Sequence, residues 1–438
     1  DVDNSIRFNS GDSAQMNKTL GTATDVDKYT ISMWVKRARL GHRQMMMRVI
    51  NPSSTSTYAF LEFQAGDSIG TNDYNGSSDG IAKITNAKFR DPSAWMHIVL
   101  ALDSTQGTGS DRSKLYVNGT QITSFSTDTD GTQNQNLMGN TSGKNIYIGG
   151  DGGQDTRYCG LYMAEVVFID GQQLDATSFG EFDEDSGIWK PIDVSGLTFG
   201  NNGFYLDFKD SSNLGNDANG GTDLTEVNIA ATDQSTDTCT NNFTTLNPLH
   251  KDNLTLSEGN LTGSNSSSSV WNRASGTIAV TSGKWYAEFK MTTQEASQVG
   301  VIEINRASLS TTDQPRTDVS CYAYKDNGQK GNNNSDSNYG ATYTDGDIIA
   351  IALDLDNHKI YFSKNGTFQN SGDPTTGATG TGSAFDLSTA YTYTFIAAVY
   401  DSSGNGKIES NFGGTQSFTV SSGNTDGNGY GNFEYAVP

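Results

Sequence analysis

The sequence predicts an all-β protein built from two tandem β-sandwiches. Its 438 residues include 49 glycines, 19 tyrosines and 20 phenylalanines but only 7 prolines, and its uncharged polar residues are mainly Ser, Thr and Asn. Aromatic residues favour strands, whereas Gly, Asn, Asp and Ser favour turns, so many short strands and few helices are expected. A chain of this length has room for two or three hydrophobic cores.

A hairpin pattern occurs twice in the sequence. Residues 98–122 and 348–368 each contain an apolar strand that ends on an aspartate (Asp103, Asp354), a polar turn, and a second strand with a Lys-aliphatic-Tyr sequence. Both second strands end at an Asn-Gly pair, whose residues accept the positive φ of a type I′ turn. The two copies begin 250 residues apart, which is typical of two domains rather than of a short repeat.

Each half of the chain offers eight strand candidates, bounded by clusters of Gly, Asn, Asp or Ser. In the first half they are residues 5–9, 29–36, 58–64, 80–85, 95–103, 114–117, 145–149 and 160–170. In the second half they are residues 276–281, 284–292, 298–304, 320–325, 347–354, 359–363, 392–400 and 406–411. Eight strands is the count of a jelly roll.

Two kinds of strand pattern are present. Residues 284–291 alternate apolar and polar side chains, which indicates a strand with one face toward a core. Residues 98–102 and 348–353 are apolar at every position. Such strands require cover on both faces, for example from a loop packed outside a central strand.

Composition along the chain predicts four segments. The first domain is residues 1–185, and residues 186–255 form an extended connector that is partly packed on it. The second domain is residues 256–415, and residues 416–438 form a Gly/Asn/Ser-rich extension. Within that extension, residues 433–437 look like a strand without an obvious partner.

Charge and cysteine content exclude several classes of protein. The formal net charge is −22 and the cations are scattered, so nucleic-acid binding is not expected. The acidity has two interpretations, which are solubility and affinity for divalent cations. The longest apolar runs are of strand length, so membrane insertion is not expected. Three widely separated cysteines allow one disulfide bridge but favour free thiols.

Several stretches carry a resemblance to known families. Residues 5–19, 29–37, 95–105, 114–125 and 160–192 resemble the laminin-G/pentraxin type of concanavalin A-like jelly roll found in marine bacteriophage structural proteins. Residues 276–413 resemble a SPRY domain, most clearly at residues 282–290, 299–303 and 343–368. Residues 241–248 are similar to the segment that joins these domains in such phage proteins. The resemblance implies two tandem concanavalin A-like jelly-roll sandwiches.

The same resemblance implies a function in binding. Laminin-G-like domains often bind glycans, sometimes through calcium, and SPRY domains bind proteins through loops at one end. We therefore expect a non-enzymatic phage structural protein on the virion surface, extracellular when mature, as a tail fibre, adhesin or capsid decoration. Its expected partners are other virion proteins and host surface glycan, in a homo-oligomeric or multi-copy assembly. No cofactor is required, although calcium remains an option. The alternatives are a glycan-degrading tail-spike enzyme and a bacterial cell-surface adhesin.

No catalytic residue is assigned. Glucanases of this shape carry a Glu-x-Asp-x-x-Glu run, which places alternate carboxylates on one face of a strand. Residues 301–305 have Asn where Asp is needed, and residues 181–185 lie between Gly180 and Gly187, which mark a loop. The four histidines belong to no recognisable nucleophile motif.

Calcium would require several oxygen ligands from loops. No EF-hand spacing is present, so the candidates also fit a simpler role as turn and capping residues. The candidates in the first domain are Asp103, Asp111, Asp128, Asp130, Asp151 and Asp155.

Two further features are candidates for ligand binding. Trp34 shares a strand face with Ser32 and Lys36, so it is a surface candidate for stacking on a sugar, unless both faces of the sheet are covered. The polar loop at residues 326–339 is either an adaptable binding loop or a solvated flexible loop. Its candidate residues are Asp326, Asn327, Asn333, Asn338 and Tyr339.

Overall fold

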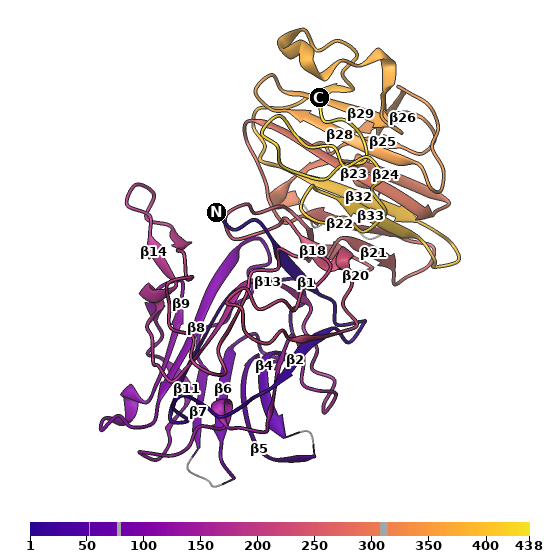
Figure 1. Ribbon diagram of the computed structural model, residues 1–438. Coiled ribbons are helices and arrows are strands. Elements are labelled where there is room, and N and C mark those ends of the chain that lie inside the picture. Colours follow the sequence, from indigo (N-terminus) through magenta and orange to yellow (C-terminus); the bar gives the residue numbers. More distant parts are fainter. Residues whose placement is uncertain (52, 77–79, 307–313) are drawn as a thin grey trace. The chain divides into compact units, whose positions relative to one another are not determined.

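The computed structural model describes residues 1–51, 53–76, 80–306 and 314–438 and divides them into two compact units (Figure 1). Unit 1 is Asp1–Asn242, and unit 2 is Phe243–Pro438. Each unit is a sandwich of antiparallel sheets, and the helical residues described are all short 3-10 turns. The all-β fold with two sandwiches is therefore confirmed. Among the described residues, no helix has the length and apolar character needed to cross a membrane.

Unit 1 contains two main sheets, here called A and B. Sheet A has the order β10 (Thr120–Gln121), β9 (Ser113–Val117), β8 (Trp95–Asp103), β3 (Lys28–Arg37), β13 (Leu161–Asp170), β1 (Ser5–Phe8) and β18 (Gln234–Ser235), and β16 (Phe204–Leu206) also pairs with β13. Sheet B has the order β11 (Phe125–Asp130), β7 (Ile81–Thr85), β6 (Ile69–Tyr74), β5 (Ser54–Phe63), β4 (Gln44–Asn51), β12 (Asn145–Ile148), β2 (Gln15–Thr19) and β17 (Thr225–Val227). Side chains from both sheets, such as Ile31, Leu100 and Leu61, meet in one core.

The outer face of sheet A is buried as well. Its apolar side chains, among them Val99 and Tyr162, pack with Ala176, Phe179 and Trp189 from the segment 174–199. This segment carries the hairpin of β14 (Gly180–Phe182) and β15 (Trp189–Pro191). The cover explains why every residue of β8 is buried, as the uninterrupted apolar run of residues 98–102 predicted.

This cover corrects the prediction for Trp34. Its side chain lies in the same outer cluster and is only 4% exposed. The ring also stacks on His97, with centroids 4.9 Å apart. Trp34 is therefore a packing residue of a face covered by protein, and it is not accessible to a sugar.

Residues 186–255 do not form the extended connector that their polar composition suggested. β16, β17 and β18 pair with β13, β2 and β1 of unit 1. β19 (Leu246–Asp252) and β20 (Leu254–Ser257) belong to sheets of unit 2. The reason is a sparse set of apolar side chains that the cores bury, which includes Phe204, Leu206, Phe208, Leu214 and Leu224 in unit 1.

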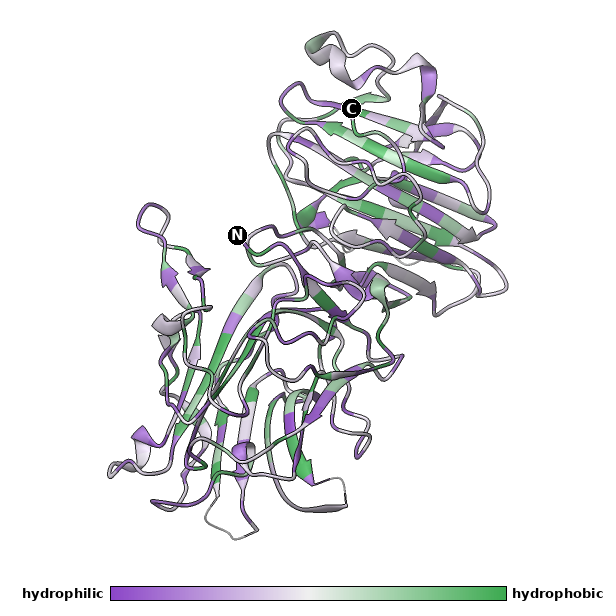
Figure 2. Ribbon diagram, in the orientation of Figure 1, coloured by the Kyte–Doolittle hydropathy of each residue, from purple (hydrophilic) through white to green (hydrophobic). Residues whose placement is uncertain are grey.

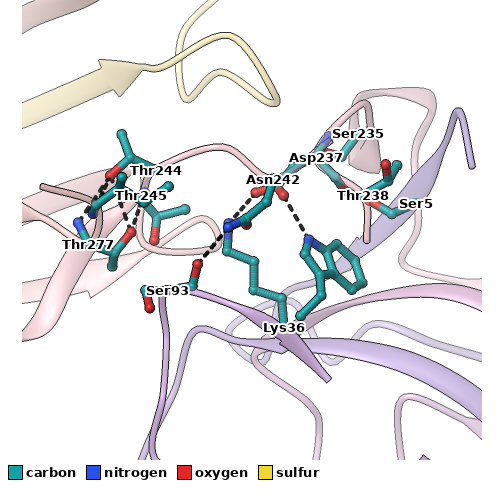
Figure 3. A network of polar contacts seen from close by, with 12 residues as sticks. Ser5, Lys36, Ser93, Ser235, Asp237, Thr238, Asn242, Thr244, Thr245 and Thr277 are labelled. Atoms are coloured by element: carbon teal, nitrogen blue, oxygen red, sulfur yellow. Dashed lines mark hydrogen bonds and ion pairs between the residues drawn. The ribbon is translucent and has the colours of Figure 1, made fainter. Parts of the chain in front are cut away.

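A buried ion pair ties residues 235–242 to sheet A (Figure 3). Lys36 Nζ lies 2.6 Å from Asp237 Oδ2 and 2.8 Å from Asn242 Oδ1. Trp95 Nε1 donates to Asp237 Oδ1 at 2.9 Å, and Asn242 Nδ2 donates to the Ser93 carbonyl at 2.8 Å. Both charged groups are almost fully buried. Removing one partner of such a pair costs about 3–5 kcal/mol, because a buried charge is left unpaired.

Unit 2 also has two main sheets, here called D and E. Sheet D has the order β19, β22 (Trp271–Gly276), β32 (Tyr393–Tyr400), β24 (Ala296–Glu303), β25 (Tyr322–Lys325), β26 (Gln329–Asn332) and β27 (Ser335–Asn338). Sheet E has the order β20, β21 (Thr262–Asn265), β33 (Lys407–Asn411), β23 (Lys284–Thr293), β28 (Ile348–Asp354), β29 (Lys359–Lys364) and β30 (Thr367–Phe368), and β31 (Phe385–Asp386) pairs with β29. Figure 2 shows hydrophobic residues gathered along the strands of both units and many hydrophilic residues in the loops.

The doubled hairpin of the sequence is present once in each unit, as β8–β9 and β28–β29. Asn118 and Asn365 both have φ of 48°, and each is followed by a glycine with positive φ. The two asparagines also act alike, because each side-chain oxygen accepts a backbone N–H at the start of the partner strand, from His97 and Ile348 respectively. The hairpins therefore share their turn chemistry as well as their sequence pattern.

The C-terminal extension packs on unit 2 rather than standing apart from it. The carboxylate of Glu288, in β23, accepts the backbone N–H groups of Glu434 and Tyr435 at 2.9 Å each. Phe433 is buried and pairs with Asn424 in an isolated bridge. Residues 433–437 are thus held by a buried side chain of sheet E, which the sequence did not indicate.

A buried carboxylate joins sheet B to sheet A inside unit 1. Asp73, in β6, accepts the backbone N–H groups of Met138 and Gly139 at 2.8 and 2.9 Å. Tyr29 Oη, from β3, lies 3.3 Å from the same carboxylate. Burial raises the pKa of Asp73 from 3.8 to about 6, although these donors oppose the shift.

We predict that the titration of Asp73 makes unit 1 less stable as the pH rises from about 4 to about 6. Because the folded-state pKa lies above that of the unfolded chain, the stabilisation from protonated Asp73 is complete below the unfolded pKa and is lost as pH rises through about 6. The loss should approach about 3 kcal/mol. Urea unfolding at pH 4 and pH 6.5 should show this loss in the native chain but not in the Asp73→Asn variant. An equal pH dependence in both proteins would contradict the prediction.

Candidate functional site

A polar cavity of about 380 Å³ opens on the outer face of sheet B. Strands β4, β5 and β6 form its floor, and the loop between β12 and β13 forms one wall. We call it the arginine pocket, because three of its residues are arginines. Its lining residues are Arg43, Arg48, Thr55, Tyr58, Phe60, Asn72, Gln154, Asp155 and Arg157.

The floor of the arginine pocket is one cross-strand row. Arg48 in β4 is opposite Phe60 in β5, and Phe60 is opposite Asn72 in β6. The neighbouring residues of β5, Ala59 and Leu61, point into the core. Because strand side chains alternate between faces, Arg48, Phe60 and Asn72 share the outer face.

Aromatic rings lie beside this row. Tyr58 stacks on Phe60 with centroids 5.8 Å apart, and it packs against Tyr74 at 5.3 Å. The Arg48 guanidinium lies 5.9 Å from the Tyr58 centroid. Tyr58, Phe60 and Tyr74 are only half-buried, so this aromatic strip remains accessible to a ligand.

The arginines differ in how they are paired. Arg43 forms an ion pair with Glu62, and its Nε lies 3.2 Å from Glu62 Oε2. Burial raises the pKa of Glu62, and the charge of Arg43 opposes the increase. Arg157 lies 3.0 Å from Asp155. These two guanidiniums are therefore held by carboxylates of the protein.

Arg48 has weaker partners. Its Nη1 lies 3.6 Å from Asp155 Oδ2 and 4.0 Å from Asp151 Oδ2, which are ion-pair rather than hydrogen-bond distances. The side chain is only 7% exposed. In the described part of the chain, its Nε and Nη1 make no hydrogen bond, and neither does Asn72 Oδ1. The floor thus offers buried donors at one end and a buried acceptor at the other.

The structure does not gather the predicted calcium candidates. Asp103 caps a turn by accepting the Thr105 N–H at 2.9 Å, Asp111 pairs with Lys114 at 3.4 Å, and both Asp128 and Asp130 pair with Lys83. Asp151 accepts three backbone N–H groups, from Gly153, Asp155 and Arg157. Within the described ranges, no group of three or more His, Cys, Asp or Glu side chains is arranged to hold a metal ion. Of the six candidates, only Asp155 lines the arginine pocket.

The polar loop at residues 326–339 is a β-hairpin rather than a flexible loop. β26 and β27 pair in it, and Asn333 and Asn334 form the turn with φ of 49° and 56°. Tyr339 is 8% exposed and packs on Tyr324 in the core. Asp326 is half-buried, and its backbone is hydrogen-bonded to Ser297 and Tyr343. Asn327, Asn333 and Asn338 are exposed. The two ends of the predicted binding loop are therefore structural residues.

One buried pair in unit 1 resembles a nucleophile and its base. Ser32 Oγ lies 2.7 Å from His97 Nε2, and Trp189 Nε1 donates to His97 Nδ1 at 3.0 Å. Burial lowers the pKa of His97 to about 3, so the ring is neutral. Because Nδ1 accepts from Trp189, the ring proton resides on Nε2, and His97 donates to Ser32. In this state, His97 has no lone pair directed at the Ser32 hydroxyl proton.

Residues 181–185 do not form a pair of catalytic carboxylates. Asp183 accepts the backbone N–H groups of Asp185 and Ser186 in the turn of the β14–β15 hairpin. Lys190 lies 3.3 Å from Glu181 and 3.2 Å from Asp183. All three cysteines are free thiols, as their spacing favoured.

The sequence analysis missed the arginine pocket, although one signal was present. In TYAFLEF, residues 57–63, the core side chains Ala59, Leu61 and Phe63 alternate with Tyr58, Phe60 and Glu62. Aromatic residues on the strand face that points away from the core indicate a surface that contacts another molecule or segment. The arginines gave no such signal, because Arg48 lies in the apolar run QMMMRVI.

Two family models match separate parts of the chain. Residues 8–173 match a laminin G model of the concanavalin A-like lectin/glucanases superfamily. Residues 284–414 match the SPRY domain. The arginine pocket belongs to the unit that carries the first match.

Several known proteins are similar to parts of the chain. The chain is 32% identical over 96 residues to the ATP-dependent RNA helicase DDX1 of Xenopus laevis, a stretch that covers 22% of this chain and 12% of the helicase. Among solved structures, the human HERC1 SPRY domain is 20% identical, covers 38% of this chain and 96% of its own, and has a TM-score of 0.31. A heptameric SAP-like pentraxin from Limulus polyphemus is 14% identical and has a TM-score of 0.30. The match covers 40% of this chain and 78% of the pentraxin chain. The family matches show that the chain contains a concanavalin A-like lectin domain of the laminin G type followed by a SPRY domain.

Proposed function

We propose that the protein is a non-enzymatic binding protein whose laminin G domain binds a saccharide in the arginine pocket. The observation that supports this most directly is the unpaired polar floor between Arg48 and Asn72, beside the half-buried rings of Tyr58 and Phe60. A sugar offers hydroxyl groups that both donate and accept, together with an apolar ring face. It would therefore satisfy the floor and cover the rings at the same time.

The non-enzymatic part of the proposal rests on the carboxylates and on His97. Hydrolysis of a glycoside needs two carboxyl groups facing a common bond. Among the described residues that line the arginine pocket, Asp155 is the one carboxylate, and it pairs with Arg157. The neutral His97 beside Ser32 is buried beneath the segment 174–199 and donates its proton to the serine.

The biological setting that we propose is the surface of a phage particle. The support is the sequence resemblance of residues 5–192 and 241–248 to marine phage structural proteins. In that setting, many copies would display the arginine pocket toward host glycan as part of a tail fibre, adhesin or capsid decoration. The SPRY domain would bind a neighbouring virion protein.

We predict that the Phe60→Ala variant binds glycans about tenfold more weakly than the native chain, because the stacking surface on the pocket floor is lost. A glycan array would identify ligands, and calorimetry would give their affinities. Phe182→Ala is the matched control, since Phe182 is exposed on the β14–β15 hairpin outside the pocket. Equal binding by the native and Phe60→Ala proteins would exclude the arginine pocket as the saccharide site.

We also predict that glycan binding and thermal stability do not depend on calcium. The candidate aspartates already accept backbone N–H groups or pair with lysine and arginine. Adding EDTA should leave both the melting temperature and the glycan affinity unchanged. A drop in either value that added calcium reverses would contradict this prediction.

The virion setting can be tested by labelling purified particles of the phage that encodes this chain. A gold-conjugated antibody against unit 1 should mark a fixed position on the head or the tail in electron micrographs, and pre-immune serum should not. Label on neither part would contradict the proposed setting but not the saccharide site.

A further inference from the structure

The chemistry of the arginine pocket also identifies the class of saccharide. The question is which ligand groups would satisfy Arg48 and Asn72 together, since both contribute unpaired polar atoms to one floor. This inference rests on the proposed function, namely that the pocket binds a saccharide.

Arg48 is the cation whose pairing is incomplete. Arg43 and Arg157 have carboxylate oxygens within 3.2 Å, whereas the carboxylate oxygen of Asp155 lies 3.6 Å from Arg48. Asp155, which supplies that oxygen, is shared with Arg157 and is about half exposed. A buried guanidinium in this position would gain most from an anionic acceptor, because charged hydrogen bonds are the stronger ones.

Asp151 does not fill this role. Its Oδ2 accepts the N–H groups of Asp155 and Arg157 at 2.8 and 3.2 Å, and its Oδ1 accepts that of Gly153 at 3.1 Å. These bonds hold the carboxylate in the loop, and its Oδ2 remains 4.0 Å from Arg48 Nη1. The loop therefore keeps its own buried carboxylate too far away for a hydrogen bond to Arg48.

Asn72 places a second requirement on the ligand. Its buried Oδ1 needs a donor, and a fully ionised inorganic anion has none. Arg48 and Asn72 are two strands apart, so their backbones are separated by about 9.5 Å. The ligand must therefore carry an anionic acceptor near one end and an O–H or N–H donor near the other, with Phe60 beneath it.

The charge of the protein makes this site distinct from the rest of the chain. Among the described residues that line the pocket, three are arginines and one is an aspartate, whereas the whole chain has a net charge of −22. Arg43 and Arg157 are paired with Glu62 and Asp155, so Arg48 is the cation that attracts an anionic ligand in the pocket, against the repulsion from the chain as a whole. That contrast favours specificity for this one location.

We infer that the arginine pocket binds an acidic sugar, with the sugar carboxylate on Arg48, a hydroxyl or amide N–H donating to Asn72 Oδ1, and the ring against Phe60. Two common carboxylate-bearing classes, uronic acids and sialic acids, share this chemistry.

The test compares each acidic sugar with its neutral counterpart. Oligogalacturonate and a sialyl oligosaccharide would be titrated into the full chain by calorimetry, beside the same compounds after reduction of the carboxyl group to a primary alcohol. At least one acid should bind tenfold or more tightly than its reduced form, and the preferred acid identifies the class. Inorganic sulfate at the same concentration should not displace it, because sulfate gives Asn72 no donor.

Two variants test the assigned contacts. Arg48→Gln should reduce the affinity for the acid to that for the reduced sugar. Asn72→Asp should weaken binding of the acid at least tenfold, because the new carboxylate lies in the same pocket and repels the carboxylate of the sugar. This second variant keeps the test decisive if Arg48→Gln fails to fold. Lys209→Gln, an equal charge change at an exposed position outside the pocket, should bind as the native chain does.

The outcomes separate this inference from the proposed function. Equal binding of acidic and reduced sugars, or glycan-array ligands that are all neutral, would overturn the acidic class and leave the saccharide site intact. Displacement by sulfate would show a general anion site and also overturn the inference. If no glycan binds at all, both the proposed function and the inference are wrong.

Discussion

The architecture of unit 1 depends on the fact that the outer face of sheet A is apolar and has to be kept from water. Its side chains, such as Val99, Tyr162 and Ile169, form a second cluster that the segment 174–199 covers. The cover buries Trp34 and keeps His97 neutral beneath Trp189. On the outer face of sheet B, by contrast, half-buried rings and arginines line a cavity. One sheet of the sandwich is thus structural on both sides, and the other has a side available for binding.

The features that were predictable from the sequence are those set by local chemistry. The Asn-Gly pairs that begin at Asn118 and Asn365 predict tight turns, and both turns have the expected positive φ. The apolar run in β8 predicts a strand that is buried on both faces, as it is in the structure. These signals depend on neighbours in the sequence, so they do not require knowledge of how distant segments meet.

The features that could not be predicted depend on which segments pair. Phe204 and Leu206 lie in a run whose pattern allows a strand, but the sequence did not indicate that β13 is its partner. Trp34 shares its strand face with the polar residues Ser32 and Lys36, yet the segment that covers it begins about 140 residues later. Arg48, Phe60 and Asn72 are separated by twelve residues at each step, and only the register of three strands brings them together. A cross-strand row of this kind cannot be recognised from the sequence of any one of its strands.

The contact between Glu288 and the C-terminal extension has a consequence for how this protein tolerates change. Glu288 accepts the main-chain N–H groups of residues 434 and 435, so the contact does not depend on the side chain at position 435. Many different residues there would preserve the anchor, with proline as the exception because it has no N–H. At position 435 the anchor is therefore specified by an internal carboxylate rather than by the residue that it holds, and that residue is freer to vary than the buried Phe433.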